Sequence, residues 1–141
     1  MITFENIVFD RILTSLNGLL SDEFSIPVRY DNLVPPQSFL ITPQSDSLIE
    51  QMSNGQTRGY EILITYQLKS GGNQSLNTLK QVSQVSERVK RLINNYSNYS
   101  PSNAYKWHDA TIQSIEYLRV EDDESLLQSQ MTFNCVSMES L

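Results

Sequence analysis

Cysteine and histidine are almost absent from this sequence of 141 residues. Cys135 is the only cysteine and His108 is the only histidine. A single thiol excludes an intrachain disulfide and a thiolate metal cluster, and with them an exported module stapled by disulfides. Such a chain suits folding in a reducing compartment.

Basic residues and long apolar runs are also scarce. Ten Lys and Arg residues stand against sixteen Asp and Glu residues, which gives a formal net charge of −6. This charge repels a DNA backbone or an anionic membrane, so sequence-general DNA binding is disfavoured. No run of about eighteen apolar residues occurs, and no basic stretch precedes an apolar one at the start. We therefore expect neither a membrane span nor a signal peptide.

The sequence does contain enough apolar material for one core. Hydrophobic residues make up 39% of the chain and charged residues 18%. A chain of about this length removes roughly 68–70% of its unfolded surface from water on folding. No repeat or internal boundary divides it, so residues 1–141 are expected to form a single domain.

The first part of the chain predicts a helix and then a short strand. Apolar residues recur at three- and four-residue steps over residues 4–20, which predicts a helix with Thr3 as its N-cap. Residues 26–30 predict a strand near a sheet edge, because Pro27 cannot donate a hydrogen bond to an interior ladder.

Two further strands are expected, separated by a polar segment. Residues 37–42 form a short candidate strand, and residues 58–68 form the clearest one, with alternating apolar side chains. Residues 44–57 are rich in polar side chains and are expected to be a loop that orders when a partner binds. Three apolar residues in this segment need a covering surface: Leu48, Ile49 and Met52.

The second half of the chain predicts a helix followed by a hairpin. One apolar stripe over residues 75–95 predicts a helix that lies on the sheet. After a loop at residues 94–103, period-two patterns predict strands at residues 110–120 and 126–138. The tip between them is acidic: Glu121, Asp122, Asp123 and Glu124. The order helix, three strands, helix, two strands predicts an α+β fold, with two helices on a largely antiparallel sheet of about five strands.

Little in the sequence suggests bound ligands. The acidic tip lacks the spaced ligands and central glycine of a calcium loop, so we expect no metal there. Gly71-Gly72 lacks the Lys-Ser/Thr of a phosphate loop, so no nucleotide or other cofactor is expected. Repeated around a channel by symmetry, the acidic tip suits a ring of charge that repels DNA phosphates.

One enzyme hypothesis stays open beside these absences. His108 and Cys135 fall on neighbouring arms of the expected hairpin and form a candidate nucleophile pair, with Asp109 orienting the imidazole. A strand cysteine readily serves as a small buried hydrophobe, so we expect no enzyme activity.

Aromatic residues cluster in the loop before the hairpin. The cluster comprises Tyr96, Tyr99, Tyr105 and Trp107. Few basic residues are interleaved with it, which disfavours a platform for stacking nucleic-acid bases. We expect these side chains to be buried loop anchors or part of a protein interface.

Four short sequence segments, together with the predicted order of helices and strands, carry a resemblance that spans nearly the whole chain. They are Ile26-Pro27-Val28-Arg29-Tyr30-Asp31-Asn32, Arg58-Gly59-Tyr60-Glu61-Ile62-Leu63-Ile64-Thr65-Tyr66, Arg88-Val89-Lys90-Arg91-Leu92-Ile93 and the stretch from Trp107 to Tyr117. With these segments the chain resembles the tail terminator, or tail completion, proteins of long-tailed bacteriophages.

The resemblance implies a structural protein of the virion. Such a subunit forms a hexameric ring on the end of the tail tube, stops tube polymerisation and presents a surface to the head connector. The implied partners are further copies of the chain, the tail tube protein and the head-tail connector or stopper protein. DNA passes through the ring without specific binding, and no membrane, catalytic residue or cofactor is implied. The implied location is the tail or neck of the virion, made in the bacterial host cytoplasm.

We expect subunit contacts or the lumen to involve residues near one strand edge and at the hairpin tip. The residues are Arg29, Tyr30, Arg58, Glu121, Asp122, Asp123 and Glu124. Two other functions stay open. One is a head completion, stopper or other neck protein, and the other is a non-viral protein-binding module that contacts its partner through residues 96–107.

Overall fold

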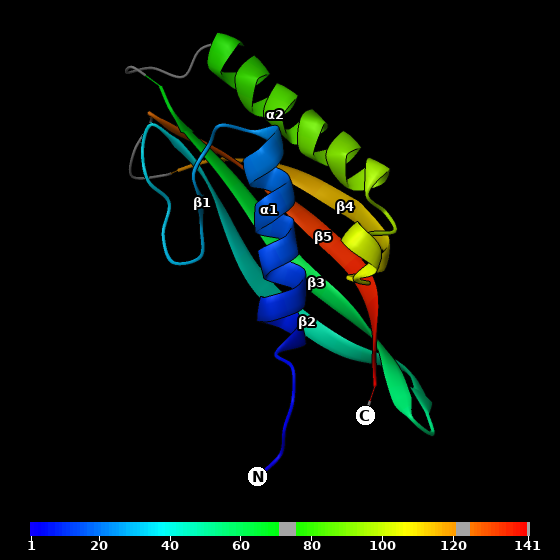
Figure 1. Cartoon of the computed structure of the whole chain (residues 1–141). Coiled ribbons are helices and arrows are strands. Elements are labelled where there is room, and N and C mark those ends of the chain that lie inside the picture. The colour runs from blue at the N-terminus through cyan, green and yellow to red at the C-terminus, as the bar shows by residue number, and fades with distance from the viewer. Residues whose placement is uncertain (71–75, 121–124, 141) are drawn as a thin grey trace.

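The fold is a five-stranded sheet with both helices on one face (Figure 1). The computed structural model describes residues 1–70, 76–120 and 125–140. The strand order is β1-β2-β3-β5-β4, in which β1 runs parallel to β2 and all other neighbours are antiparallel. The expected α+β fold and the expected order of helices and strands are therefore confirmed.

The elements have the following bounds in chain order. A π-helix spans Ile7–Leu13 and continues as α1, Thr14–Glu23. The strands are β1 Val28–Arg29, β2 Gln37–Met52, β3 Gly55–Lys69, β4 His108–Arg119 and β5 Leu126–Ser140. Between β3 and β4 lie α2, Leu76–Asn95, and a short 3-10 helix, Pro101–Asn103.

The first helix begins later than its apolar pattern predicts. Asn6 caps it, because the Asn6 side chain accepts a hydrogen bond from the backbone N–H of Phe9 at 3.3 Å. Thr3 as the N-cap is therefore wrong, and Phe4 is 79% exposed rather than buried. A π-helical turn contains more residues than an α-helical turn, because its hydrogen bonds join residues five apart. Leu13 therefore lies in the core beside Ile12, although it does not fit the three- and four-residue steps that predicted the helix.

The largest departure from expectation is the hairpin between β2 and β3. Residues 44–57 were expected to be a loop, but all except the two turn residues Ser53 and Asn54 belong to strands. These residues are polar because the hairpin projects beyond the helices into solvent, where residues 44–52 are all exposed (Figure 1). We call residues 44–57 the β2–β3 arm.

β5 supports the arm from the other side of β3. The two strands pair from Gly55 opposite Ser140 to Lys69 opposite Leu126. A Cβ atom added at Gly55 would lie 2.5 Å from the backbone oxygen of Glu139, so this close approach requires glycine. Pairing over a long sequence distance thus imposes strand on a segment whose composition favours a loop.

The core fills the space between the helices and one face of the sheet. α2 contacts β3, β4 and β5 and buries the predicted apolar stripe from Val82 to Ile93, whereas Leu76 and Leu79 in its first turn are exposed. Ile62, Ile64 and Phe133 are fully buried, and each such side chain stabilises the fold by roughly 1.5–3 kcal/mol relative to exposure. The hydroxyls of Ser86 and Ser129 lie 2.7 Å apart in this layer, so these buried polar groups satisfy each other.

The remaining expectations for the sheet are largely confirmed. β1 lies at the sheet edge, as Pro27 predicts, and β4 and β5 form the expected hairpin. The hairpin tip, with Glu121, Asp122, Asp123 and Glu124, lies outside the described residues, as does Gly71-Gly72. Within the described part of the chain, no helix is long and apolar enough to cross a membrane.

Trp107 anchors the loop after α2. Its side chain is fully buried, and its ring centroid lies 5.1 Å from that of Tyr99 and 5.4 Å from that of Phe133. Its Nε1–H donates a hydrogen bond of 2.9 Å to the backbone oxygen of Tyr96. Trp107 is therefore a buried loop anchor, one of the two roles expected for the aromatic cluster.

Replacing Trp107 with Phe should lower the free energy of unfolding by about 1–3 kcal/mol, because the Tyr96 carbonyl loses its donor and the smaller ring leaves a void. Urea unfolding followed by far-UV circular dichroism measures the change. Tyr117→Phe is the matched control, since Tyr117 is 47% exposed and should shift stability by less than about 0.5 kcal/mol. Equal effects of the two substitutions would contradict the anchoring role.

Candidate interaction surfaces

One face of the sheet carries no helix over the described residues, and we call it the bare face. Strand register places there the side chains that alternate with the core. They include Leu63, Thr65 and Gln67 of β3, Gln128, Gln130, Thr132 and Asn134 of β5, and Thr111 and Ser114 of β4. Gln128 Nε2 donates to Gln67 Oε1 at 2.7 Å. The same register adds two acids, Glu61 and Glu116, and the apolar residues Leu40, Leu118 and Val136, so the bare face is mainly polar and is acidic toward its middle.

The sheet has two unlike edges. β4 forms one edge over its twelve residues. β1 pairs only with Phe39 and Leu40, so along the rest of β2 the described residues place no further strand beside it. Register shifts in both edge strands, and Pro43 in β2, interrupt these edges. Such interruptions discourage unspecific pairing with another strand.

The β2–β3 arm combines exposed apolar and acidic side chains. Leu48, Ile49 and Met52 are 51%, 57% and 38% exposed. Glu50 lies among them and takes part in none of the ion pairs formed by the described residues. Leu48 lies on one face of the arm and Met52 with Glu50 on the other, because they pair with Arg58, Gly55 and Thr57 respectively. Exposed apolar side chains gathered in a polar surface are typical of a contact site.

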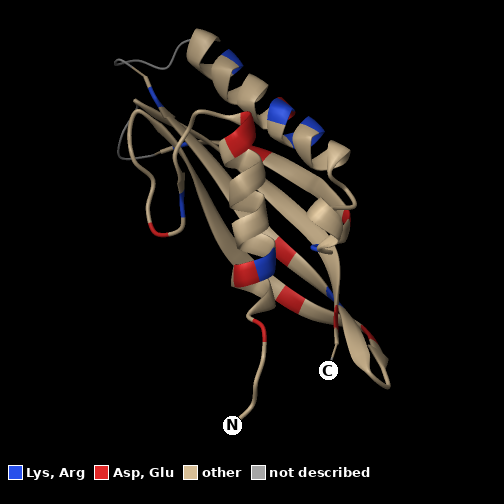
Figure 2. Cartoon of the chain, in the orientation of Figure 1, with Lys and Arg blue, Asp and Glu red and all other residues tan. Residues whose placement is uncertain are grey.

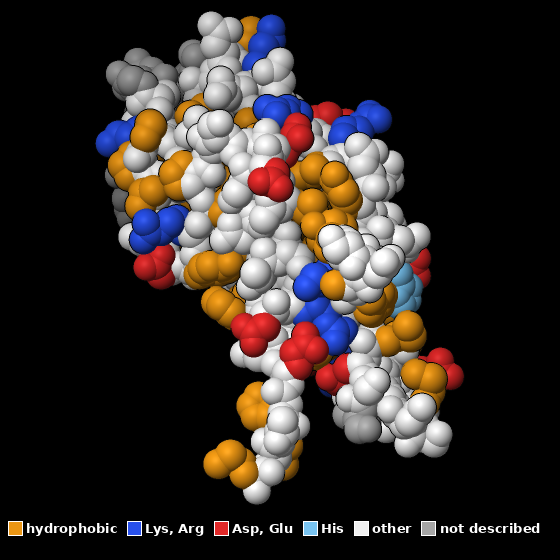
Figure 3. All heavy atoms as spheres, in the orientation of Figure 1, with side chains coloured by type: hydrophobic (Ala, Val, Ile, Leu, Met, Phe, Trp, Pro, Cys, Tyr) orange, Lys and Arg blue, Asp and Glu red, His pale blue; other side chains and the backbone are white. Residues whose placement is uncertain are grey.

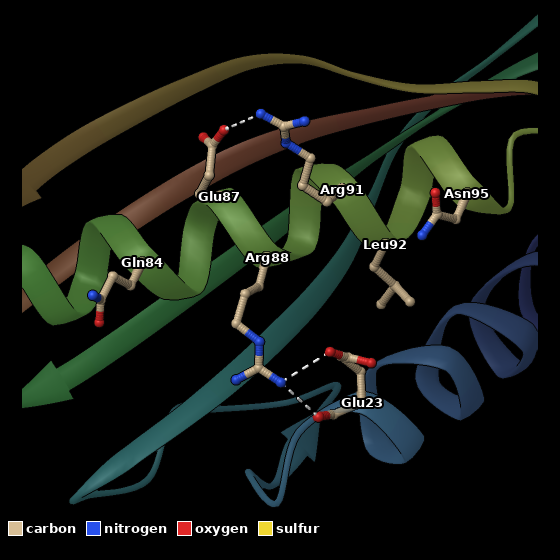
Figure 4. Close-up of a pocket in the computed structure, with 7 residues that line it drawn as sticks. All are labelled: Glu23, Gln84, Glu87, Arg88, Arg91, Leu92 and Asn95. Atoms are coloured by element: carbon tan, nitrogen blue, oxygen red, sulfur yellow. Dashed lines mark hydrogen bonds and ion pairs between the residues drawn. The ribbon is translucent and has the colours of Figure 1, made fainter.

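A groove lies between the end of α1 and the second half of α2 (Figure 4). It has a volume of about 480 Å³ and is lined by Glu23, Gln84, Glu87, Arg88, Arg91, Leu92 and Asn95. Nη2 of Arg88 donates to the Glu23 carboxylate at 2.9 Å, and the Arg88 guanidinium lies 4.4 Å from the ring centroid of Phe24. Leu92, which is 8% exposed, adds apolar surface between the helices. We call this feature the α1–α2 groove.

Charge is distributed unevenly along the molecule (Figure 2). The exposed side of α2 carries Lys80, Arg88, Lys90 and Arg91 against the single acid Glu87. Hydrogen bonds, first from Lys90 and then from Arg91, hold the pKa of Glu87 below its usual value. The arm and the strand end beside it carry Asp46, Glu50 and Glu139. The subunit is therefore basic along α2 and acidic toward the arm.

Two of the expected interface residues, Arg29 and Tyr30, lie together at the sheet edge. Arg29 hydrogen-bonds the side chains of Asp31 and Asn32, each at 3.3 Å. The Tyr30 hydroxyl accepts a hydrogen bond of 2.9 Å from Asn17 Nδ2. These contacts tie the end of β1 to its following turn and to α1, and they leave both side chains partly exposed.

Arg58 does not join the other two. It lies in β3, an interior strand, and pairs there with Leu48, whereas Arg29 pairs with Leu40. These two positions on β2 are eight residues apart, or about 26 Å at the usual rise per residue. Arg58 forms an ion pair with Asp46 inside the arm. It therefore stabilises the arm and does not share an edge with Arg29.

Arg11 is an important residue that the sequence analysis missed. Its Nη1 donates to Ser137 Oγ at 2.8 Å and to the backbone oxygen of Met138 at 2.7 Å. Its Nε and Nη2 bind both carboxylate oxygens of Glu5, and these bonds hold the pKa of Glu5 below its usual value. Arg11 thus joins the N-terminal segment and the first helix to the end of β5, beside the base of the arm.

The geometry argues against the thiol and imidazole as a catalytic pair. Cys135 faces the core, but His108 lies opposite Val136, whose side chain points to the bare face. The His108 Nδ1 atom lies 2.7 Å from the Tyr105 hydroxyl. Burial raises the pKa of the Cys135 thiol to about 12, whereas a nucleophilic cysteine has a lowered pKa. The residues that the structure describes also contain no group of three potential metal ligands.

Cys135 should react very slowly with iodoacetamide at neutral pH, because the thiol is 2% exposed and stays protonated. Mass spectrometry of the native chain over time measures the labelling. Chain unfolded in urea serves as the control and should label quickly. Selective labelling of native Cys135 within minutes would reopen the enzyme hypothesis.

Stability should fall as the pH rises above about 8.5, the usual pKa of a thiol. Burial raises the pKa of Cys135 to about 12, so between these values the unfolded chain loses a proton that the folded chain keeps. The free energy of unfolding then decreases by up to about 1.4 kcal/mol per pH unit for this group. Urea unfolding of wild type and Cys135→Ala at pH 8 and pH 10 measures it. An equal decrease in both proteins would show that the thiol does not contribute.

Comparison with known proteins assigns no family to this geometry. No protein-family model matches the chain, and no curated protein matches it significantly. The functional argument therefore depends on the surfaces of the subunit and on the short segments of its sequence.

Proposed function

We propose that this chain is a structural protein of the phage virion that forms a ring capping the tail tube. The ring ends tube polymerisation and joins the tail to the head connector. Its subunits are made in the bacterial host cytoplasm and end in the tail or neck of the particle. No catalytic step is part of this role.

The observation that carries the proposal is that two separate surfaces of the subunit, the β2–β3 arm and helix α2 with its groove, differ in charge and shape. A closed ring requires each copy to offer one patch to one neighbour and a different patch to the other. The arm is acidic and projects with exposed Leu48 and Ile49, whereas α2 is basic and borders a groove. Such a subunit suits head-to-tail association better than a symmetric pair.

The bare face supports the same proposal. Glu61 and Glu116 lie among uncharged polar side chains on this face. Repeated around the lumen of a ring, these acids would repel phosphates, and DNA would pass without specific binding. This face would act beside the acidic hairpin tip, which the sequence suggested for the same role and which lies outside the described residues.

The segments that resemble tail terminators fall in elements that build the sheet and its cover. Residues 26–32 contain β1, residues 58–66 lie in β3, residues 88–93 lie in α2 and residues 107–117 contain most of β4. The resemblance therefore covers both edges of the sheet and the helix that borders the groove. Arg29, Tyr30 and the hairpin tip remain candidates for contacts with the tube or the connector.

Two alternatives compete with this role. A head completion, stopper or other neck protein would also form a ring, but it would bind the connector and not the tube. A non-viral binding module would remain a monomer and use the loop from Tyr96 to Trp107, where Tyr96 is 39% exposed.

The purified chain should form a hexamer, either alone or once tail tube protein is added. The tube end would act as a template that brings the six subunits of the ring together. Light scattering over a range of concentrations, with and without tube protein, measures the mass. Electron microscopy should show that the chain stops elongation of polymerising tube protein and sits at tube ends. Tube protein alone, which keeps elongating, is the control.

Other results would point elsewhere. A ring that binds the connector but leaves tube growth unchanged would favour the stopper alternative. A monomer that ignores the tube protein would favour an independent binding module and would contradict the terminator role.

A further inference from the structure

The β2–β3 arm is costly to expose unless another surface covers it. Leu48, Ile49 and Met52 crowd into a hairpin that projects beyond the helices. Ile49 covers Gly59 on its own strand pair, since a Cβ atom at Gly59 would meet Ile49 Cδ1 at 3.4 Å. More than a third of each of the three side chains nevertheless faces water. An exposed apolar hairpin of this kind is a contact site or an aggregation hazard.

The arm cannot reach the α1–α2 groove of its own chain. The groove lies beside the end of α1 and the second half of α2, whereas the arm projects from the other end of the sheet (Figure 1). Figure 3 shows apolar side chains gathered between the helices and again toward the end where the arm projects. The two surfaces can therefore meet only between two copies, with the arm of one on the helices of the next.

Charge is complementary between the arm and helix α2, whose exposed side is basic, whereas the groove lining itself balances two arginines with two glutamates. Arg91 borders the groove with a side chain that is 74% exposed, and its contact with Glu87 is a 3.3 Å pair at the surface. Glu50 of the arm has no ion-pair partner among the described residues. A surface pair such as Arg91 with Glu87 contributes little, so Arg91 is free to turn toward an incoming carboxylate.

We propose that the arm of one copy occupies the α1–α2 groove of the next copy. Met52 lies against Leu92 and the apolar stems of the groove, and Glu50 pairs with Arg91. Strand register places Met52 and Glu50 on one face of the arm, because they pair with Gly55 and Thr57, whereas Leu48 pairs with Arg58 on the other face. This contact rests on the ring proposed above and names the surfaces that join its subunits. Because arm and groove differ, the association is heterologous and continues from copy to copy until it closes.

Docking in the groove is favoured over simple pairing of the two sheet edges. Pro43 cannot donate to a ladder, and β2 and β4 each contain two register shifts. Edge pairing would also leave the apolar side chains of the arm exposed. Groove docking covers Met52 and brings unlike charges together.

Disulfide trapping tests the contact directly. The variant Met52→Cys/Gln84→Cys places one thiol on the arm, on the face of Glu50, and one in the groove, and mild oxidation should yield a ladder of covalent species beyond the dimer. Wild type should give no ladder, because its only cysteine is buried. The matched control Met52→Cys/Tyr117→Cys places the second thiol on the β4 edge and should crosslink much less.

Charge reversal tests the pair independently. Glu50→Arg and Arg91→Glu should each weaken self-association about tenfold or more, and the double variant should recover most of the loss. Lys80→Glu, on α2 but outside the groove, is the matched control and should change little. Sedimentation velocity over a concentration range, with and without tube protein, measures association, and urea unfolding confirms that each variant folds.

The outcomes separate this contact from the function proposed above. A ring that caps tubes but ignores the charge reversals, with no ladder from Met52→Cys/Gln84→Cys, would overturn the contact and leave the terminator role standing. A ladder from the β4 control instead would establish edge pairing and overturn groove docking. Crosslinking of Met52→Cys to added tube protein in place of a second copy would also overturn the contact, and a chain that never self-associates would overturn the contact and the ring together.

Discussion

Pairing of β3 on both sides determines most of the remaining structure. Its fifteen residues pair with β2 along one edge and with β5 along the other, and both partners follow it to Gly55. The backbone groups of β3 are therefore satisfied well beyond the helices, and the hairpin stays in strand conformation where no core supports it. The projecting arm is a consequence of this length and not of its own composition.

The same strand divides the molecule into two unlike faces. Tyr60, Ile62 and Ile64 point into the core, and the residues between them point to the bare face. The helices cover the face that carries most of the apolar side chains, and the bare face is mainly polar, with a few apolar side chains such as Leu63 among the polar ones. In the role proposed here, this mainly polar face would line the aqueous channel.

The periodicity of apolar residues predicted the helices and strands whose burial follows a local pattern. It did not predict the segments whose structure depends on pairing with distant parts of the chain. The stripe of α2 and the alternation of β3 fixed their type and approximate bounds, because burial repeats at the period of the element. The arm was missed because pairing with β5, far along the chain, overrides its polar composition. The π-helical turns shifted the buried face of the first helix in a way that a 3.6-residue period does not describe.

The candidate surfaces were less predictable than the elements. Arg29 and Tyr30 lie at a sheet edge as expected, because Pro27 marked that edge. Arg58 was grouped with them by similarity of type, but strand order separates them. The groove and the contacts of Arg11 could not be anticipated, because both join segments that lie far apart in the sequence.

Opposing electrostatic and apolar terms decide when such a subunit assembles. A net charge of −6 makes copies repel one another at long range, whereas the proposed contact between arm and groove would act only at short range. Free subunits at low concentration must therefore overcome repulsion and the entropy of association before apolar burial stabilises them. A tube end that binds several subunits side by side removes much of this cost by raising their effective concentration. In the role proposed here, the ring would then close where a tube end is available, and premature closure in solution would be disfavoured by charge.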